Sequence, residues 1–365
     1  MAQDRPLKGV RILEFAGIGP GPFCGMILSD LGADVVRIDR PGVKPQGVGK
    51  VTGRGRRSVA LDLKSDTGIA TALNLIEKAD ALFEGFRPGV MERIGLGPDE
   101  TLVRNPALVY ARMTGWGQNG PLSHAAGHDI NYIALSGALG SMGRKDEPPP
   151  PPLNLVGDYG GGAMFLIVGL LAGLLRARET GKGQVIDAAM TDGSALLMAL
   201  FHDLKNYGVW RDERGANLLD GAAPFYDTYE CADGKFVSIG AIEPQFYALL
   251  LEKTGLAADP DFSMQMDQKR WPELKHKLAA IIRKKTRDEW VEIMEGTDVC
   301  FAPVLSLSEA PTHPHNVTRN TFIDFEGTIQ PAAAPRFRGV PNTPERRAPE
   351  PGEHTEEVLA EWDCK

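Results

Sequence analysis

The stretch VRILEFAGIGPGPFCGMILSDLGADVVRID, residues 10–39, decides the fold that we expect. Apolar and β-branched residues dominate 10–15 and 33–38, which predicts two buried strands, and the segment 21–31 between them predicts a helix. A strand, a helix and a second strand in succession form a βαβ unit, whose two strands lie parallel in one sheet.

The same alternation continues along the N-terminal third of the chain. Strands are predicted at 58–61, 81–84 and 108–112, and a helix at 66–79 begins after a cap near Ser65. Strands that alternate with helices predict an α/β fold in which a parallel sheet is covered on both faces.

A different pattern begins near residue 221. Two alternating segments at 225–230 and 235–239 flank an Asp-Gly turn and predict an antiparallel hairpin. Helical segments near 245–254 and 271–285 follow it. We therefore expect a second, smaller α+β domain after the parallel sheet.

Proline-rich segments interrupt these patterns. The consecutive prolines at 148–152 cannot continue a helix or a central strand, so they predict a stiff extended connector that leads to Asn154. The stretch 331–351 is also rich in proline and predicts an extended segment that returns over the surface.

The composition is that of a globular protein with an acidic balance. The 365 residues carry a formal net charge of −8, and 42% of them are hydrophobic. Such a chain repels nucleic acid and anionic lipid overall, so an anionic ligand needs a local basic cluster. The longest apolar run, 163–175, is shorter than the roughly 18 residues of a membrane span and predicts a buried helix.

The cysteines are scattered, with neither metal-site spacing nor the pattern of a disulfide scaffold. They are Cys24, Cys231, Cys300 and Cys364. The first residues, Met-Ala-Gln-Asp-Arg-Pro, lack the basic and apolar segments of a signal peptide. We therefore expect a cytoplasmic protein with reduced thiols.

The first predicted strand is followed by the glycine-rich turn Gly17-Ile18-Gly19-Pro20-Gly21-Pro22, and Asp39 ends the second strand. This arrangement resembles part of a dinucleotide-binding fingerprint, in which three glycines admit a pyrophosphate to a helix N-terminus. The third glycine position falls on Pro22 or Cys24, depending on where the count begins. A structural turn is therefore the stronger interpretation, and NAD binding is the weaker one.

Basic residues gather at the ends of the predicted strands and in the loops that follow them. The crevice beyond the carboxyl ends of parallel strands is where such sheets bind ligands, and guanidinium groups suit phosphate oxygens. A solvated basic face would give the same pattern, and spacing alone leaves both interpretations open. The residues are Arg40, Arg54, Arg56, Arg57, Lys64, Arg87 and Arg93.

Three titratable residues are candidates for proton transfer. His128 precedes an apolar helix, Asp158 precedes three glycines and a long apolar helix, and Glu243 lies at a strand-to-helix junction. Each also has an ordinary interpretation, as an exposed histidine or a helix cap. In the functional interpretation Asp158 exchanges a proton with a ligand, while N–H groups near 160–162 stabilise an oxyanion.

Several short segments, taken in order along the chain, carry a resemblance to a known family. They are 17–22, 31–38, 61–64, 86–90, 114–118, 127–132, 154–162, 181–184, 242–246 and 335–337. Together they resemble the family III CoA-transferase superfamily over nearly the whole chain. Within it the sequence is most similar to the racemases that act on 2-methylacyl-CoA thioesters, because it has His128, Asp158 and Glu243 together.

The resemblance implies a large Rossmann-like domain at 1–220, a small α+β domain at 221–325 and a C-terminal extension at 326–365 that returns to the large domain. It also implies an interlocked homodimer with active sites between domains of different subunits. No metal or redox cofactor is implied, since coenzyme A is part of the substrate. Substrate and CoA contacts are implied for Arg40, Arg54, Leu61, Asp62, Leu63, Lys64, Gly85, Phe86, Arg87, Arg93, Gly127, Asp129, Ile130, Asn131, Tyr132 and Asn154.

The expected reaction is racemisation at C2 of a 2-methylacyl-CoA by two bases. His128 would take the proton from the 2S thioester to form an enolate, and protonated Asp158 would deliver a proton to the opposite face. Glu243 would orient His128. Two alternatives stay open: a family III CoA-transferase that uses Asp158 as nucleophile, and a non-catalytic acyl-CoA-binding protein that needs the arginines alone.

Overall fold

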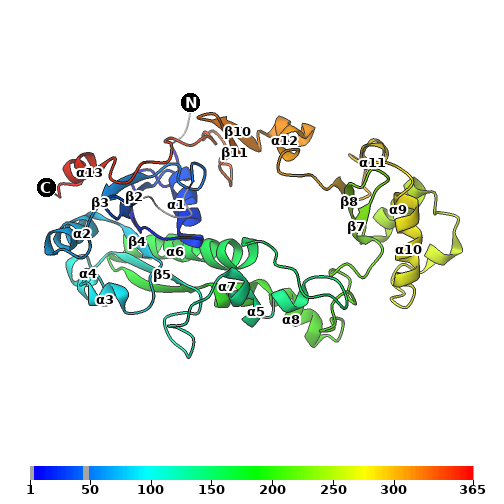
Figure 1. Cartoon of the computed structure of the whole chain (residues 1–365), viewed down its shortest axis with the longest axis horizontal. Helices are drawn as coiled ribbons and strands as arrows, with labels where there is room; N and C mark the ends of the chain where they lie inside the picture. Colours follow the sequence, from blue (N-terminus) through cyan, green and yellow to red (C-terminus); the bar gives the residue numbers. More distant parts are fainter. Residues whose placement is uncertain (1–3, 44–48, 365) are drawn as a thin grey trace. The chain divides into compact units, whose positions relative to one another are not determined.

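The computed structural model describes residues 4–43 and 49–364 and divides into two compact units (Figure 1). The first unit holds the described residues of Met1–Ala138, Pro151–Met198 and His315–Lys365, and the second holds Leu139–Pro150 and Ala199–Pro314. Both units are therefore built from segments that are far apart in the sequence.

A six-stranded parallel sheet forms the centre of the first unit and confirms the expected α/β class. Its spatial order is β3-β2-β1-β4-β5-β6. This order reverses between β1 and β4, and a reversal opens a crevice at the carboxyl ends of the two strands. The strands are β1 Arg11–Phe15, β2 Asp34–Asp39, β3 Arg57–Ala60, β4 Ala81–Glu84, β5 Val109–Thr114 and β6 Gln184–Ala189.

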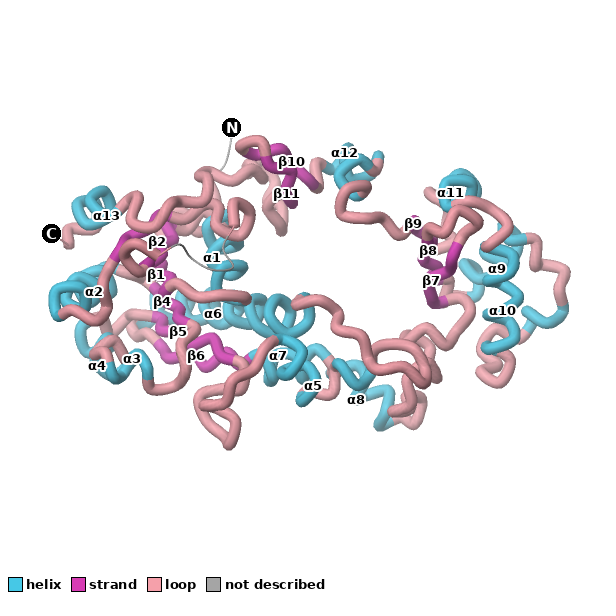
Figure 2. The backbone as a smooth tube through the Cα atoms, in the orientation of Figure 1, coloured by secondary structure: helices cyan, strands magenta, loops and turns pink. Residues whose placement is uncertain are grey.

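Helices cover both faces of this sheet, as the alternating pattern predicted (Figure 1, Figure 2). One face is covered by α1 (Pro20–Asp30) and α6 (Met164–Thr180), and the other by α2 (Asp66–Lys78). The Ser65 hydroxyl caps α2 as expected, because it accepts an N–H of the first turn at 3.1 Å. The other helices of this unit outside its C-terminal part are α3 Val90–Arg93, α4 Pro98–Arg104, α5 Asp129–Leu135 and α7 Met190–Leu197.

The C-terminal part of the chain packs on the β3 edge of the sheet. Helix α12 (Pro314–Arg319) begins at the boundary between the units, and β10 (Phe322–Phe325) and β11 (Thr328–Pro331) form an antiparallel pair. After irregular backbone, α13 (Thr355–Glu361) lies against β3, where the Arg57 guanidinium pairs with two of its carboxylates at 3.0 and 2.6 Å.

The apolar run at 163–175 belongs to a longer helical segment than expected. A π-helix over Leu155–Ala163, labelled η2, continues directly into α6. The combined segment of 26 residues is long and apolar enough to cross a membrane, and 50% of its apolar window is buried inside the fold. Core helices of soluble proteins share these features, so the segment is only weak support for a membrane span; within 4–43 and 49–364 it is the single helix of this kind.

The second unit contains an antiparallel sheet of three strands in the order β7-β8-β9, and its first two strands confirm the predicted hairpin. The buried rings of Trp271 and Trp290 belong to its own hydrophobic core. Its elements are α8 Ala199–Asn206, β7 Tyr226–Glu230, β8 Phe236–Gly240, α9 Pro244–Thr254, α10 Trp271–Ile282, α11 Arg287–Met294 and β9 Phe301–Pro303.

The boundaries of the units differ from those expected at 220 and 325. Residues 199–220 belong to the second unit, and so does the proline-containing strap at 139–150. Ion pairing explains the position of the strap, since the Arg144 guanidinium contacts the buried Asp227 carboxylate at 2.6 Å. The sequence does not reveal such long-range pairs. The boundaries were therefore predicted where the local pattern of strands and helices changes.

Candidate active site

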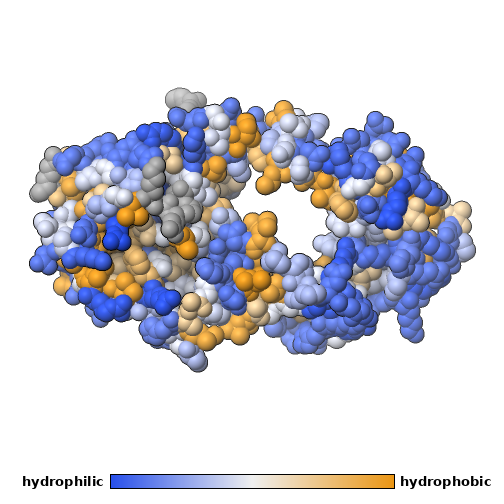
Figure 3. All heavy atoms as spheres, viewed as in Figure 1, coloured by the Kyte–Doolittle hydropathy of each residue, from blue (hydrophilic) through white to orange (hydrophobic). Residues whose placement is uncertain are grey.

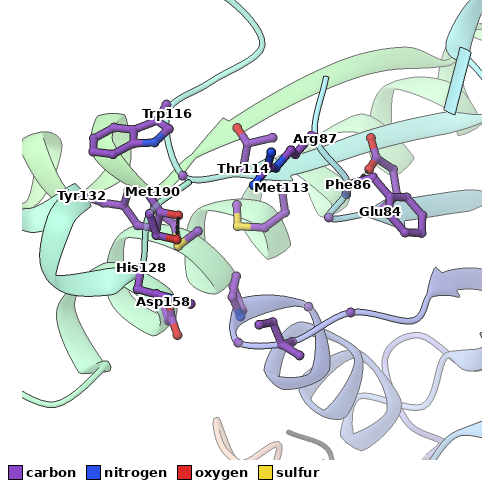
Figure 4. A pocket seen from close by; sticks show the side chains of 18 of the residues that line it. Glu84, Phe86, Arg87, Met113, Thr114, Trp116, His128, Tyr132, Asp158 and Met190 are labelled. Carbon is purple, nitrogen blue, oxygen red and sulfur yellow. Dashed lines mark hydrogen bonds between the residues drawn. The ribbon is translucent and has the colours of Figure 1, made fainter. Parts of the chain in front are cut away.

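A cavity of about 460 Å³ lies at the carboxyl ends of β1, β4 and β5, where the winding of the sheet reverses (Figure 4). Every residue that lines it belongs to the first unit. Its position is the one that open parallel sheets use for ligands. The lining comprises Phe15, Gly17, Ile18, Gly19, Pro20, Gly21, Phe83, Glu84, Gly85, Phe86, Arg87, Pro88, Met113, Thr114, Gly115, Trp116, Ser123, Ala125, Ala126, Gly127, His128, Tyr132, Asp158 and Met190.

The glycine-rich turn after β1 forms one wall and brings the backbone close to Asp158. Gly19 has a φ of +67°, and a Cβ placed on it would lie 2.9 Å from the Asp158 Oδ2 atom. Pro20 and Pro22 have no N–H, so the start of α1 lacks donors that a pyrophosphate cradle needs. These features favour the structural interpretation of the turn over NAD binding.

Asp158 is held by neighbours on both sides. Its N–H donates to Asp129 Oδ2 at 2.6 Å, and its Oδ2 accepts a hydrogen bond from Asn154 Nδ2 at 3.1 Å. Burial raises the pKa of the Asp158 carboxyl; the Asn154 hydrogen bond opposes this rise, the charge of Asp129 adds to it, and His128 opposes it. The environment therefore favours the protonated form more than water does, as a proton donor requires.

The three glycines after Asp158 do not serve as free donors, so that expectation was wrong. They lie inside η2, where each N–H bonds to the carbonyl five residues earlier. Their role is close packing on α7: a Cβ on Gly161 would lie 2.4 Å from Ser194 Oγ, and one on Gly193 would lie 1.9 Å from Gly161 O. Asp158 is likewise not the predicted N-cap but a residue within the π-helix.

Replacing Gly193 by alanine is expected to destabilise the protein by about 1–3 kcal/mol, because the new methyl group cannot fit against the Gly161 carbonyl. The helix that carries Asp158 would be displaced, so enzymatic activity would fall as well. Urea denaturation measures the first effect. Gly140→Ala is the matched control, since no atom lies within 4 Å of its added Cβ; equal stability of the two variants would contradict the packing argument.

His128 lies on the same cavity at the start of α5. Its N–H donates to Asn131 Oδ1 at 3.0 Å, and its exposed ring lies beside Asp158 at one end of the cavity in Figure 4. The preceding Gly127 is held by Tyr132, whose hydroxyl donates to the Gly127 carbonyl. Trp116 packs edge-on against the Tyr132 ring with centroids 4.8 Å apart. The predicted pair of His128 and Asp158 is thus brought together.

The other predicted residues of the 127–132 segment differ in whether their side chains are buried or exposed. Asp129 is buried and holds Asp158, whereas Ile130 and Asn131 are exposed and outside the cavity lining. Asn154 also acts through Asp158 and does not line the cavity. The sequence had indicated contacts with the substrate for all of these residues.

The basic cluster is smaller than predicted. Arg54 is 1% exposed, and its guanidinium bonds to Asp30 at 2.6 Å and to Gln330 at 2.8 Å. Arg56 and Arg57 are also buried in ion pairs, with Glu14 and Asp34 respectively. A guanidinium taken out of water needs such partners, so these three arginines hold the sheet and the expected Arg54 contact with CoA was wrong.

Four of the predicted cations remain exposed: Arg40, Lys64, Arg87 and Arg93. Arg87 reaches the cavity together with Gly85 and Phe86. In the segment after β3, Leu61 is buried, Leu63 is partly buried and Asp62 is exposed. The sequence interpretation passed over Glu84, Met113, Thr114, Trp116 and Met190, although their positions at or just beyond strand ends were a signal that could have found them.

Glu243 lies in the second unit, immediately before α9, and its carboxylate is exposed. Burial raises the pKa of the nearby Cys300 thiol, and the charge of Glu243 adds to that rise. As for metals, within residues 4–43 and 49–364 no group of three or more His, Cys, Asp and Glu side chains is arranged to hold an ion.

Comparison with known proteins agrees with the fold. A family model described as CoA-transferase family III matches residues 7–355. A mouse protein named alpha-methylacyl-CoA racemase is 48% identical over 98% of this chain and 93% of its own length. A succinyl-CoA–D-citramalate CoA-transferase of Chloroflexus aurantiacus is 30% identical over 98% of this chain and 94% of its own length.

A solved structure shows the same fold. The crystal structure of a CAIB/BAIF family protein from Brucella suis superimposes with a TM-score of 0.83 at 24% sequence identity. The match covers 99% of this chain and 100% of the other.

Proposed function

The chain belongs to CoA-transferase family III, and from that premise we propose that it is a racemase that interconverts the 2R and 2S epimers of 2-methylacyl-CoA thioesters. The observation that carries this proposal is the meeting of His128 and Asp158 on one cavity at the carboxyl ends of the sheet. The greater identity to a mouse racemase than to a bacterial CoA-transferase, 48% against 30%, supports the same choice.

Racemisation needs one group to remove the C2 proton and another to return a proton to the opposite face. We propose that neutral His128 takes the proton of the 2S thioester, which leaves an enolate, and that the protonated Asp158 carboxyl donates to C2 from the other side. The 2R thioester follows the reverse path. The raised pKa of Asp158 supports this assignment because it keeps more of the acid form available.

The rest of the cavity suits a thioester with an apolar acyl group. Met113, Met190 and Trp116 supply an apolar surface, and methionine side chains adapt to different chain shapes. We propose that Arg87 and its neighbours Gly85 and Phe86 contact the CoA portion. We propose that the exposed cations Arg40, Lys64 and Arg93, together with the segment Leu61–Lys64, contact its phosphates. No metal or redox cofactor takes part in this scheme.

Glu243 is proposed as the carboxylate that orients His128. Glu243→Gln is expected to slow racemisation roughly tenfold or more, because the imidazole would lose the group that orients it. Rate measurements with a single epimer of a 2-methylacyl-CoA test this. The exposed Glu252 on α9 supplies the control variant Glu252→Gln; equal rates for both variants would remove Glu243 from the mechanism.

We further propose an interlocked homodimer. Exposed apolar side chains lie on α6 and α7 of the first unit, including Val168, Leu175, Leu196 and Leu197. Figure 3 shows apolar surface over α6 and α7. Large apolar patches on soluble proteins mark interaction surfaces, so a second copy of the chain is the proposed cover.

The function is tested with a single epimer of a 2-methylacyl-CoA in deuterium oxide without any acceptor acid. Deuterium at C2 together with approach to an epimer mixture is the expected result, measured by NMR. No exchange, followed by CoA transfer once a carboxylic acid is added, would instead establish the transferase alternative with Asp158 as nucleophile. Binding of CoA without either reaction would leave a non-catalytic acyl-CoA-binding protein.

A further inference from the structure

A buried carboxylate lies at the end of the cavity away from His128 and Asp158. Glu84 is the last residue of β4 and is 2% exposed. In Figure 4 it lies beside Phe86, across the cavity from the two proposed acid–base groups. The mechanism above gives Glu84 no role, although burying a carboxylate has a high energetic cost unless it is well compensated.

The two oxygens of Glu84 accept from two different donors. Oε2 accepts the Phe86 N–H at 2.7 Å, and Oε1 receives the Arg112 Nε–H at 3.3 Å. The first contact closes a tight loop around Gly85 and fixes the backbone that leads into Arg87. The second comes from the residue directly opposite Glu84 on β5. The carboxylate thus ties the segment 85–87 to the rigid sheet.

The positive charge beside Glu84 is shared. Arg112 also contacts Glu92 of α3 at 2.9 Å, so one guanidinium faces two carboxylates. Tyr110 on β5 also faces this group, and its hydroxyl donates to the Leu96 carbonyl. Burial raises the pKa of Glu84 to about 7, while the Phe86 N–H and Arg112 oppose the rise and Glu92 adds to it. Glu84 therefore titrates near neutral pH.

The bare carboxylate accepts from both donors more strongly than the acid does. A protonated carboxyl keeps some acceptor capacity, but it has lost its charge and carries an O–H on one of the two oxygens. Protonation would therefore weaken the link to Phe86 or the link to Arg112. Because Gly85, Phe86 and Arg87 all line the cavity, a loosened link changes the shape that a ligand meets there.

We propose that Glu84 is a positioning residue that holds the segment 85–87 in the form that binds the CoA portion of the substrate, and that proton uptake by Glu84 releases this hold. The assignment rests on the proposed function for the identity of the ligand. It predicts that CoA affinity, and not the turnover of bound thioester, rises with pH. The sign follows from the titration: the bare form predominates above pH 7 and the protonated form below it.

The test is calorimetric binding of free CoA at about pH 6, 7 and 8, which brackets the titration. Glu84→Gln keeps the shape of the side chain but not its charge, so CoA binding at the highest pH is expected to weaken about tenfold, as loss of a charged hydrogen bond would do. The ratio of variant to unaltered dissociation constants should approach one at the lowest pH. This ratio cancels the titration of CoA itself, since both proteins meet the same ligand.

Glu92→Gln is the matched control, because it removes the other carboxylate on Arg112 without touching Phe86. Its effect on CoA affinity is expected to be small and independent of pH. An equal loss in both variants would overturn the assignment to Glu84, since the Arg112 charge alone would then hold the segment. A Glu84→Gln affinity equal to that of the unaltered protein at every pH would also overturn it.

Hydrogen exchange of the unaltered protein tests the same link without a variant. After correction for the intrinsic pH dependence of exchange, the Phe86 amide should be less protected at low pH than at high pH. Equal protection at both would contradict the proposal, even if the Glu84→Gln variant fails to fold.

The outcomes for CoA binding and for exchange at C2 separate this proposal from the proposed function. CoA binding with no exchange at C2 of a thioester would remove the racemase function and leave this positioning role. Failure of the unaltered protein to bind CoA would remove both.

Discussion

Replacing His128 by alanine is expected to abolish exchange of the C2 proton of the 2S thioester and to slow racemisation by roughly 10²–10⁴-fold, the usual contribution of a positioned acid–base group. The residue is exposed on the cavity, and its backbone N–H caps α5 through Asn131. Because that backbone bond survives the substitution, the loss should come from chemistry and not from misfolding.

An asymmetry between the epimers makes the His128→Ala test sharp. Asp158 stays in place in the variant, so exchange from the 2R thioester should persist more than exchange from the 2S thioester. NMR of each epimer in deuterium oxide separates the two cases. His276→Ala is the control, since His276 is an exposed histidine on α10 and lies outside the cavity lining. Full exchange of the 2S proton by His128→Ala would exclude His128 from the reaction.

Asp158→Asn is expected to reduce racemisation by a similar factor, roughly 10²–10⁴-fold. An asparagine can still accept the Asn154 hydrogen bond and fits the same space beside Gly19, so η2 should keep its place. What disappears is the acidic carboxyl proton that could be delivered to C2. Exchange from the 2S thioester through His128 should survive better than exchange from the 2R thioester, the mirror image of the His128→Ala result.

The same substitution also has a pH signature. The pKa of Asp158 is raised by burial, so the folded protein holds this proton more tightly than the unfolded chain does. Its contribution to stability is therefore fully present below the ordinary carboxyl pKa and is lost as pH rises through the raised value. Asp158→Asn should remove this dependence from the free energy of unfolding, whereas Asp99→Asn on the exposed part of α4 should not.

A chemical trap at Asp158 of the unaltered protein further separates the two enzyme classes. A transferase would form an acyl anhydride on Asp158, so hydroxylamine would modify the unaltered protein in the presence of its thioester substrate. The racemase needs no such adduct. Mass spectrometry after hydroxylamine treatment should show Asp158 unmodified; its conversion to a hydroxamate would contradict the two-base scheme.

Local pattern was enough to predict most of the fold. The alternation of apolar strands and amphipathic helices predicted β1 to β5 with α1 and α2, and the Asp-Gly turn predicted the hairpin of β7 and β8. The strand β6 was not predicted, since its first residues, Gln184 and Val185, are exposed and lack the buried pattern of the central strands. Burial periodicity is a local property, so it can be read where a strand is covered on both faces.

The sequence by itself determined where the chemistry is placed along the chain. Parallel strands bring their carboxyl ends to one edge, so the residues that follow β1 and β4 had to meet there. His128 and Asp158 could be named from their types and their neighbours. The two residues are 30 positions apart in the sequence, and the contacts of Asp158 with Asp129 and Gly19 bring them close together in space.

Only the tertiary structure decided which side chains are free to act. Arg54 and Arg87 look alike in the sequence, yet Arg54 is committed to Asp30 and Gln330 whereas Arg87 is exposed at the cavity. Likewise the sequence suggested that the glycines after Asp158 offer free backbone N–H donors, but in the structure these glycines pack closely against α7. The physical reason is the same in each case: burial, ion pairing and close approach depend on partners far along the chain, and local pattern carries no record of them.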